Sequence, residues 1–205
     1  MLDLLDRYDP DVIRFYLTTI MPETSDSEFR EDELITANNG MLIATWGNLA
    51  NRVISMIARN FEGIVPTSGP LAPESAALLD ATRTAFATVA GDYNLCHFRN
   101  GLQECLKLAQ AANRYLDERA PWKAVKTDLP HAAETLATTL NVINGLKTLL
   151  HPILPFSTQA LHEDLSQVGT VATSGWAFAS IPEGTRLRTP RALYRKLDVG
   201  TEVSA

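Results

Sequence analysis

Apolar residues recur at three- and four-residue steps from Phe29 to about Asn60, and this spacing most constrains what the chain can fold into. The residues in the series are Leu34, Met41, Leu42, Trp46, Leu49, Val53, Met56, Ile57 and Phe61. Such steps place apolar side chains on one continuous stripe of a helix. Similar spacing predicts helices over about 73–90, 95–119, 131–150 and 156–167, and Asp9-Pro10-Asp11 is a typical helix start. No stretch of useful length alternates apolar and polar residues, so we predict an all-α fold, a helical bundle with short connections.

Turn and breaker residues predict where these helices end. Gly91-Asp92-Tyr93-Asn94 predicts a turn with Asn94 as a cap, and Pro121 predicts a break after Arg119. Asn38-Asn39-Gly40 predicts a local weakening of the long helix, as a kink or a close approach of another helix. In the 73–90 helix we expect the inward-facing residues to be Ala77, Leu78, Ala81, Ala85, Phe86 and Val89. After Gly169 the apolar density drops, which predicts an extended, partly ordered tail over 169–205.

Composition bounds the class of protein and its partners. The 205 residues are 45% hydrophobic and 20% charged, enough for a core, and the formal net charge is -6. An acidic balance argues against nonspecific binding of nucleic acid through bulk charge, but it is compatible with a local basic patch that reads a few nucleotides. We do not expect DNA as a partner. No apolar run has the length of a membrane span and the first residues do not resemble a signal peptide, so we expect a soluble, cytoplasmic protein without a membrane partner.

Residues that could carry catalysis or bind a metal form no familiar pattern. Cys96 and Cys105 lie nine apart without a CxxC or histidine spacing, so we expect both to be small buried hydrophobic residues in a reducing compartment. The four histidines are scattered without metal-like spacing, and we expect them to be polar or capping side chains. No P-loop, HExxH or GxSxG motif is present, so nothing in the sequence predicts an active site or a metal site.

Two polar residues on the long helix are candidates for base recognition. Asn48 and Arg52 lie four apart and therefore project from the same side of a helix. An amide beside a guanidinium can hydrogen-bond the polar edge of a base. The alternative is a solvated polar face, or a cap for a neighbouring turn, and spacing alone favours that alternative.

An aromatic residue at the predicted helix break is the second candidate. Trp122 follows Pro121, and it is surrounded in the sequence by the cations Arg114, Arg119, Lys123 and Lys126. A large aromatic ring beside cations suits a base-stacking platform with phosphate contacts. The alternative is that Trp122 closes the core at a helix junction. Trp46 lies on the apolar stripe, and we expect it in the core.

Several motifs in order resemble methionyl-tRNA synthetases in the region that follows their catalytic domain. The resemblance covers the chain to about Leu165, stays plausible as far as Leu197, and is specific because the motifs occur together. The motifs are Arg7-Tyr8-Asp9-Pro10-Asp11, Arg14-Phe15-Tyr16-Leu17, Met21-Pro22-Glu23-Thr24-Ser25-Asp26-Ser27-Glu28-Phe29, Thr45-Trp46-Gly47-Asn48-Leu49-Ala50-Asn51-Arg52-Val53, Arg59-Asn60-Phe61-Glu62-Gly63, Ala120-Pro121-Trp122-Lys123 and His151-Pro152-Ile153-Leu154-Pro155-Phe156-Ser157.

This resemblance implies a fold, a function and site residues. It implies the end of a stem-contact segment over 1–27, the helical anticodon-binding domain of a class I aminoacyl-tRNA synthetase over 28–168, and the tail over 169–205. In the family, the residues matching Asn48, Arg52 and Trp122 recognise the anticodon, here the CAU of methionine tRNA. We expect phosphate contacts from nearby cations, chosen by charge and sequence proximity: Arg59, Arg114, Arg119, Lys123 and Lys126.

The family's HIGH and KMSKS nucleotide-binding motifs and its zinc-binding insertion are absent from these residues. The expectation is a module of a methionine–tRNA ligase that carries no active site and no cofactor, while ATP, and zinc where it occurs, belong to the catalytic domain. That domain, in cis or in trans, and methionine tRNA are the expected partners.

Two other functions stay open. One is the homologous domain of a synthetase for valine, isoleucine, leucine or cysteine; the other is a helical protein-interaction bundle that does not bind RNA. The observation that would separate these functions from recognition of the methionine anticodon is whether Asn48, Arg52 and Trp122 lie together on one open surface.

Overall fold

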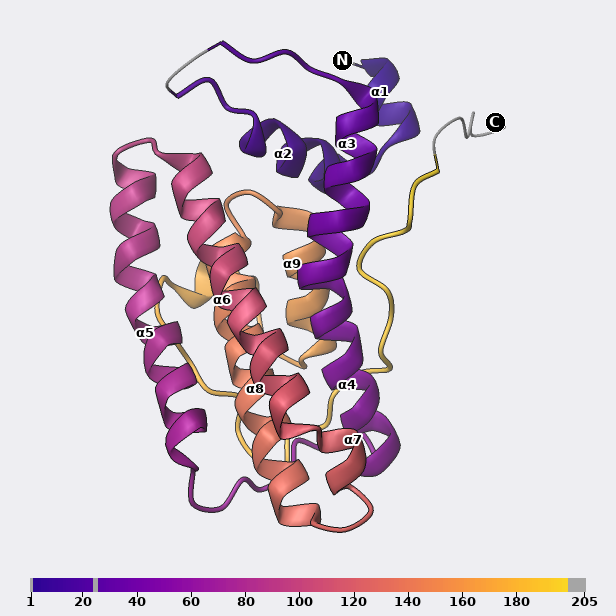
Figure 1. Ribbon diagram of the computed structural model, residues 1–205, viewed down its shortest axis with the longest axis vertical. Helices are drawn as coiled ribbons and strands as arrows, with labels where there is room; N and C mark the ends of the chain where they lie inside the picture. The colour runs from indigo at the N-terminus through magenta and orange to yellow at the C-terminus, as the bar shows by residue number, and fades with distance from the viewer. Residues whose placement is uncertain (1, 24–25, 199–205) are drawn as a thin grey trace.

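The computed structural model describes residues 2–23 and 26–198, and this part of the chain is built of helices without a strand (Figure 1). The predicted all-α fold is therefore confirmed. Thr24 and Ser25 of the third matching motif, and residues 199–205 of the predicted tail, lie outside the described residues.

Two short helices precede the bundle, α1 (Leu2–Arg7) and α2 (Pro10–Thr19). As predicted, α2 starts at Asp9-Pro10: the Asp9 side chain accepts a hydrogen bond from the backbone N–H of Asp11 at 2.9 Å, and proline occupies the first helical position. Arg7 and Tyr8 both donate to the carboxylate of Glu31, the first residue of the next helix. These bonds attach the N-terminal helices to the bundle.

The predicted long helix is present as one rod of three segments, which runs down the right side of Figure 1. They are α3 (Glu31–Ala37), a π-helix η1 (Asn38–Gly47) and α4 (Asn48–Asn60). The weakness predicted at 38–40 is therefore a change of helix type, because a π-helix bonds residues five apart rather than four. Within η1 the buried positions step by four, from Asn38 to Leu42 to Trp46. Met41, predicted on the apolar stripe, lies one position off this buried line and is 39% exposed, so the prediction that it faces the core is wrong.

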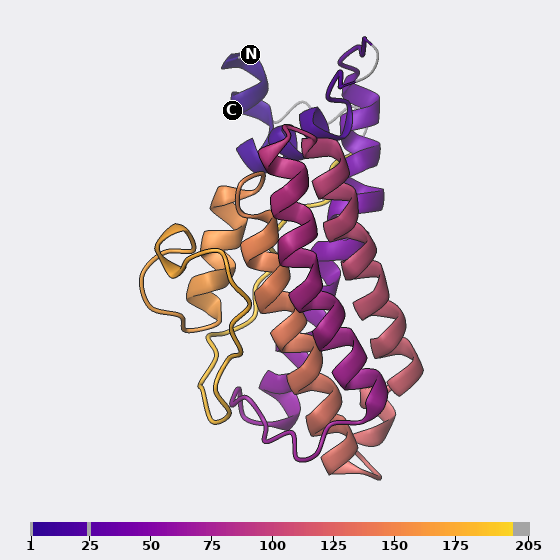
Figure 2. The ribbon, with the colours of Figure 1, turned by 90° about the vertical axis from the view of Figure 1, so that its left-hand side faces the viewer.

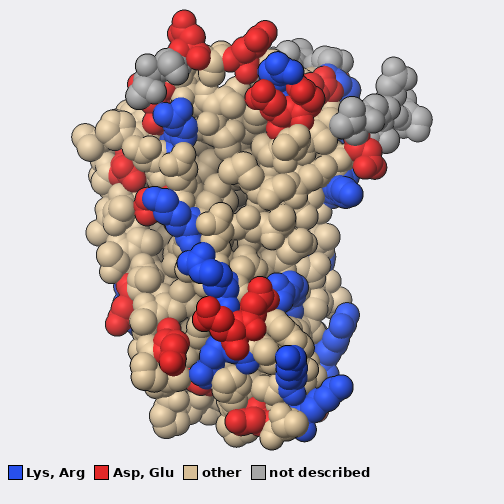
Figure 3. All heavy atoms as spheres, in the orientation of Figure 1, with Lys and Arg blue, Asp and Glu red and all other residues tan. Residues whose placement is uncertain are grey.

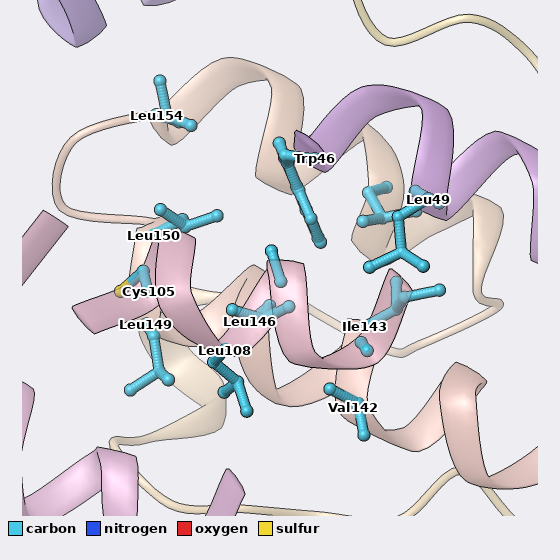
Figure 4. Packing of buried hydrophobic residues seen from close by; sticks show 14 of the residues in the cluster. Trp46, Leu49, Cys105, Leu108, Val142, Ile143, Leu146, Leu149, Leu150 and Leu154 are labelled. Atoms are coloured by element: carbon cyan, nitrogen blue, oxygen red, sulfur yellow. The ribbon is translucent and has the colours of Figure 1, made fainter. Parts of the chain in front are cut away.

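Three long helices form the body of the bundle: α5 (Pro73–Asn94), α6 (Phe98–Arg119) and α8 (Leu129–Leu150). Nearly every residue of α8 after its first turn is buried, so α8 is the central helix of the core. Trp46 and Leu49 point from η1 and α4 toward Ile143 and Leu146 of α8 (Figure 4). The expectation that Trp46 belongs to the core is confirmed, since its side chain is fully buried.

The turn between α5 and α6 differs from the prediction. α5 continues through Gly91–Asn94, so Asn94 is not a cap, and the chain turns instead at Cys96, which has a φ of 60°. Tyr93 explains the extra helical turn, because its ring lies where a Cβ on Gly101 would stand, 2.3 Å from the nearest ring atom. This packing across the two helices outweighs the turn propensity of the local sequence. Cys96 is exposed, so the prediction that it is buried is wrong, whereas Cys105 is buried as expected.

The inward face of α5 also differs from the prediction at two alanines. Ala77 and Ala81 are exposed, whereas Ser75 and Thr82 are fully buried. Thr82 packs against Gly145 of α8, and the Ser75 hydroxyl donates a hydrogen bond to Glu134 at 2.6 Å. The pattern failed here because alanine fits either face, and because small polar residues with partners can occupy interior positions.

The segment after α9 (Pro155–Asp164) is largely without helix as far as residue 198, and specific contacts attach it to the bundle. It contains one 3-10 turn, η2 (Ala172–Ser174), and an isolated antiparallel bridge between Arg186 and Ile64. Its loops lie beside α9 in Figure 2, and the indole of Trp176 donates a hydrogen bond to the carbonyl of Phe86 at 2.9 Å. The chain then climbs along the α3–α4 rod (Figure 1). Within the described residues, no helix has the length and apolar character that crossing a membrane requires.

Candidate nucleic-acid interface

A sharp corner after α6 presents Trp122. Ala120 adopts a left-handed conformation, with φ 43° and ψ 55°, and its N–H still bonds the carbonyl of Leu116 at 3.0 Å. Pro121 follows at the first position of the short helix α7 (Pro121–Ala124), as its fixed φ favours. The predicted break is therefore confirmed. Pro121 and Ala124 are buried, which leaves the Trp122 side chain 39% exposed beside the corner.

Arg52, Asp117 and Trp122 come together from three helices. The Arg52 guanidinium carbon lies 5.5 Å from the centre of the Trp122 ring, and its Nη2 donates to the Asp117 carboxylate at 3.0 Å. The first distance is within the range of a cation–π contact. Figure 1 shows where the helices meet, at the lower end of the rod where α4, α6 and α7 converge. Residues seventy positions apart in sequence thus form one exposed group.

Asn48 lies one helical turn before Arg52 and is also exposed. Among the described residues, none hydrogen-bonds its side-chain amide, so it does not cap a neighbouring turn. Asn48, Arg52 and Trp122 are therefore exposed on one surface, as the RNA-binding alternative requires. Their role in binding RNA stays a prediction.

The predicted phosphate-contacting cations divide into two groups. Arg59, Arg114, Lys123 and Lys126 are exposed. Basic side chains run down the middle of the face in Figure 3 and gather at its lower end, around a group of carboxylates. Arg119 differs, because its side chain is only 17% exposed and pairs with the nearly buried Glu134. We therefore leave Arg119 out of the surface.

Glu134 is the centre of a polar network inside this end of the bundle. Besides Arg119, it receives hydrogen bonds from the backbone N–H of Ala72 and the hydroxyl of Ser75, both at 2.6 Å. Burial alone would raise the pKa of the Glu134 carboxyl, but these bonds and the charge of Arg119 outweigh it and hold the pKa below its usual value. The carboxylate therefore stays ionised and fixes the start of α8 to α5 and α6.

Two side chains near the surface of Asn48, Arg52 and Trp122 were not predicted from the sequence. Asp117 orients Arg52, and Asn113 of α6 donates to the carbonyl of Thr45 in η1 at 2.8 Å. Both connect α6 to the rod across more than sixty residues of chain. A helical pattern gives no sign of such long-range pairs, although Asp117 lies one turn before the predicted break.

The possible metal ligands and the buried thiol of Cys105 bear on whether this chain holds a metal centre. In the described part of the chain, no three His, Cys, Asp or Glu side chains group as a metal site would require. Burial raises the pKa of the Cys105 thiol to about 12, so the thiol is neutral and packs as a hydrophobic side chain.

The chain is similar to curated methionine–tRNA ligases over almost its whole length. It is 39% identical to the one from Thermobifida fusca and 38% identical to the one from Roseiflexus castenholzii, in each case over 96% of this chain. The matched region is 37% of either relative, so the chain spans a little over a third of their length.

A solved structure has the same fold as this chain. The apo form of Mycobacterium tuberculosis methionyl-tRNA synthetase matches with a TM-score of 0.89 and 25% identity, over 97% of this chain and 41% of that one.

Two family models match the chain. The family model of class I tRNA synthetases (M) matches residues 1–54. The family model of the anticodon binding domain of methionyl tRNA ligase matches residues 65–202, which include Asp117 and Trp122. The chain therefore belongs to the family of methionyl tRNA ligase anticodon-binding domains.

Proposed function

We propose that the surface formed by Asn48, Arg52 and Trp122 reads the CAU anticodon of methionine tRNA. The observation that carries the proposal is the contact of the Arg52 guanidinium with the exposed Trp122 ring, at 5.5 Å. A splayed-out base stacks on an aromatic or guanidinium plane and is identified by hydrogen bonds along its edge. In this arrangement Trp122 supplies the stacking platform, while Asn48 and Arg52 supply the hydrogen bonds.

The Arg52–Asp117 pair suits such a role because it is easily exchanged. The side chains are 41% and 61% exposed, and an ion pair in solvent contributes about 0–1 kcal/mol. A guanidinium has five N–H donors in a planar fork, so a base edge can engage Arg52 at small cost to the fold. Asp117 meanwhile holds the side chain near the Trp122 ring before RNA arrives.

Phosphate contacts come from Arg59, Arg114, Lys123 and Lys126 in this proposal. All are exposed, and two of them, Lys123 and Lys126, follow Trp122 in and just after α7. The whole chain carries a net charge of -6, so attraction to RNA must arise from this local group rather than from bulk charge. Binding should therefore depend on a small number of cations and weaken with salt in proportion to that number.

The surrounding enzyme is part of the same proposal. The chain acts within a cytoplasmic methionine–tRNA ligase, and methionine and ATP are handled by a catalytic domain in cis or in trans. The chain alone should accordingly show no methionine-dependent exchange of pyrophosphate into ATP. Exchange that survives exhaustive purification would contradict this division of labour.

The test is fluorescence anisotropy of this chain with a labelled methionine-tRNA anticodon stem-loop at fixed salt. The matched control is the same stem-loop with the first anticodon base changed, so only base recognition differs between the two. We expect the cognate loop to bind more tightly, by about 1–3 kcal/mol for one misread base. Equal affinity for the two loops would contradict the proposal.

One observation favours a second function, a helical protein-interaction bundle that does not bind RNA. The net charge of -6 is unfavourable for an RNA-binding protein. In that case neither stem-loop would bind at low salt, where electrostatic attraction to phosphates is strongest.

A further inference from the structure

The last described residues of the chain run alongside the π-helix that precedes Asn48. Asn39 Nδ2 donates to the carbonyl of Leu197 at 2.6 Å, and the Leu197 N–H donates back to Asn39 Oδ1 at 3.0 Å. Asn38 Nδ2 donates to the carbonyl of Arg195 at 3.2 Å. The tail backbone is therefore bonded to the first turn of η1, at the point where its yellow trace passes the rod in Figure 1.

The same stretch of tail also covers the other end of η1. A Cβ on Gly47, the last residue of the π-helix, would stand 3.1 Å from the Tyr194 ring, so the ring lies against the rod there. Tyr194 is fixed from behind, because its hydroxyl shares a 2.6 Å hydrogen bond with that of Ser157. Ser157 in turn donates to the buried carboxylate of Asp11. Residues 194–197, here named the strap, thus span the π-helix from end to end.

Helix type at this point decides which way Asn48 and Arg52 face. The backbone N–H of Asn48 bonds the carbonyl of Ile43, five residues back, so Asn48 itself closes the final π turn. A π turn takes up more residues than an α turn. Conversion of η1 to α-helix would therefore rotate α4 relative to α3 and to the corner that carries Trp122.

The π form needs outside support. π-helices are rare and usually only one turn long, whereas η1 covers ten residues. Asn38 is fully buried, and its Oδ1 has no hydrogen-bond partner in the described part of the chain. An unsatisfied buried oxygen is a cost that the surrounding contacts must offset. Asn113 of α6 supports η1 at Thr45, and the strap contacts both its first turn and its last residue.

We propose that the strap is a positioning element: it keeps residues 38–47 π-helical and thereby aims Asn48 and Arg52 at the base that stacks on Trp122. The inference rests on the proposed function. Asn39 and Tyr194 are positioning residues that touch no RNA and act on specificity through the rod. Loosening the strap should reduce discrimination between anticodons more than it reduces overall affinity.

The experiment compares the ratio of affinities for the cognate stem-loop and the loop with a changed first base. Asn39→Ala removes both hydrogen bonds to Leu197 and also the 3.0 Å bond that Asn39 Oδ1 accepts from Asn38. Tyr194→Ala removes the ring from Gly47 and leaves the bond between Asn38 and Asn39 in place. We expect the ratio to fall by about fivefold in each variant, the size of effect typical of residues that act indirectly on a site. Tyr194→Phe keeps the ring over Gly47 and loses only the hydroxyl bond to Ser157, so its ratio should stay closer to that of the parent than the ratio of Tyr194→Ala.

Trp176→Ala is the matched control, since it removes a tail contact of comparable size to α5, away from η1. It should lower the melting temperature while leaving the ratio unchanged. Hydrogen exchange of the amides of 42–48 gives a second readout, which should accelerate in both Asn39→Ala and Tyr194→Ala and not in Trp176→Ala. This readout needs no RNA, and Asn39→Ala is a surface-side change that keeps the core intact.

The outcomes separate the two proposals. A parent chain that does not discriminate between the loops overturns the proposed function. A discriminating parent with an unchanged ratio and unchanged exchange in Asn39→Ala overturns the strap. An equal loss of ratio in Trp176→Ala also overturns it, because general destabilisation would then account for the effect.

Discussion

Two arginines at the same end of the bundle, Arg52 and Arg119, each contact an aromatic ring and a carboxylate, but the first is exposed to solvent and the second is largely buried. Arg52 lies over Trp122 at 5.5 Å and pairs with Asp117, and Arg119 lies over Tyr115 at 6.0 Å and pairs with Glu134. The first pair is 41% and 61% exposed, whereas the second is 17% and 9% exposed. Chemistry alone therefore does not distinguish a binding group from a structural one.

Burial decides what each group can do. Solvent screens the exposed pair, so Arg52 can exchange Asp117 for a ligand with little change in the stability of the fold. The buried pair has given up its hydration, so removal of one partner leaves an uncompensated charge inside the protein. Glu134 is moreover bonded to Ala72 and Ser75, which connects three parts of the bundle. The difference predicts opposite phenotypes for two similar substitutions.

The largest effect should come from Arg119→Ala. Loss of the guanidinium leaves the Glu134 carboxylate buried without its cation, at a cost of about 3 kcal/mol. Arg52→Ala, the matched change on the surface, should cost less than about 1 kcal/mol. Urea unfolding of both variants measures the difference. Equal destabilisation by the two would remove the distinction between the pairs.

Acid should reveal the same buried pair. The pKa of Glu134 is lower in the folded chain than in the unfolded one, so its contribution to stability is fully present above the unfolded value, about 4.3. That contribution is lost as the pH falls through the lower folded pKa. Glu134→Gln should flatten the loss of stability in this acid range, as followed by urea unfolding at a series of pH values. If Glu134→Gln lost stability in acid as steeply as the parent does, Glu134 would not be the source of this pH dependence.

Sequence reasoning located the helices and the exposed candidates because their signals are local. The helical period predicted the bundle, and Asp9-Pro10 predicted the start of α2. Pro121 predicted the break between α6 and α7. Family motifs pointed to Asn48, Arg52 and Trp122, which the fold places on one surface. These features depend on spacing along the chain, which the sequence contains directly.

The errors occur where distant residues decide the structure. Asn94 stays helical because Tyr93 packs against Gly101 of the next helix. Arg119 was grouped with the phosphate-contacting cations because its partner Glu134 lies on another helix. Charge and proximity in sequence cannot separate a buried cation from an exposed one.

Trp122→Ala should have the next largest effect, and on binding rather than stability. Removal of the stacking platform should weaken binding by about 1–3 kcal/mol. Every base has a π-face, so cognate and altered stem-loops should lose affinity alike. Anisotropy titrations with both loops give the result, and an effect on the cognate loop alone would assign Trp122 a different role.

Arg52→Ala should change selectivity instead. Its guanidinium hydrogen-bonds a base edge in the proposed complex, so its loss should cost the cognate loop about 1–3 kcal/mol and the altered loop less. Arg119→Ala, studied below its unfolding midpoint, is the control with the same change of charge and no expected change in selectivity. Parent-like binding by both Arg52→Ala and Trp122→Ala would favour the RNA-inactive bundle.

The smallest effect should come from Lys126→Ala, which removes an exposed charge near Trp122 without touching the stack or the base edge. A cation that contacts one phosphate displaces about one counterion, so the log–log dependence of affinity on salt should flatten by about one unit. Both stem-loops should weaken equally, because phosphates are the same in each. Lys107→Ala is the matched control: it removes the same charge about 15 Å along α6 from Asp117, at 1.5 Å per residue, and should leave the salt slope unchanged. Since the chain is acidic as a whole, a loss of slope in both variants would mean that the general field of the protein governs attraction. A loss in Lys126→Ala alone would place the RNA backbone beside α7, on the surface that carries the exposed Arg52.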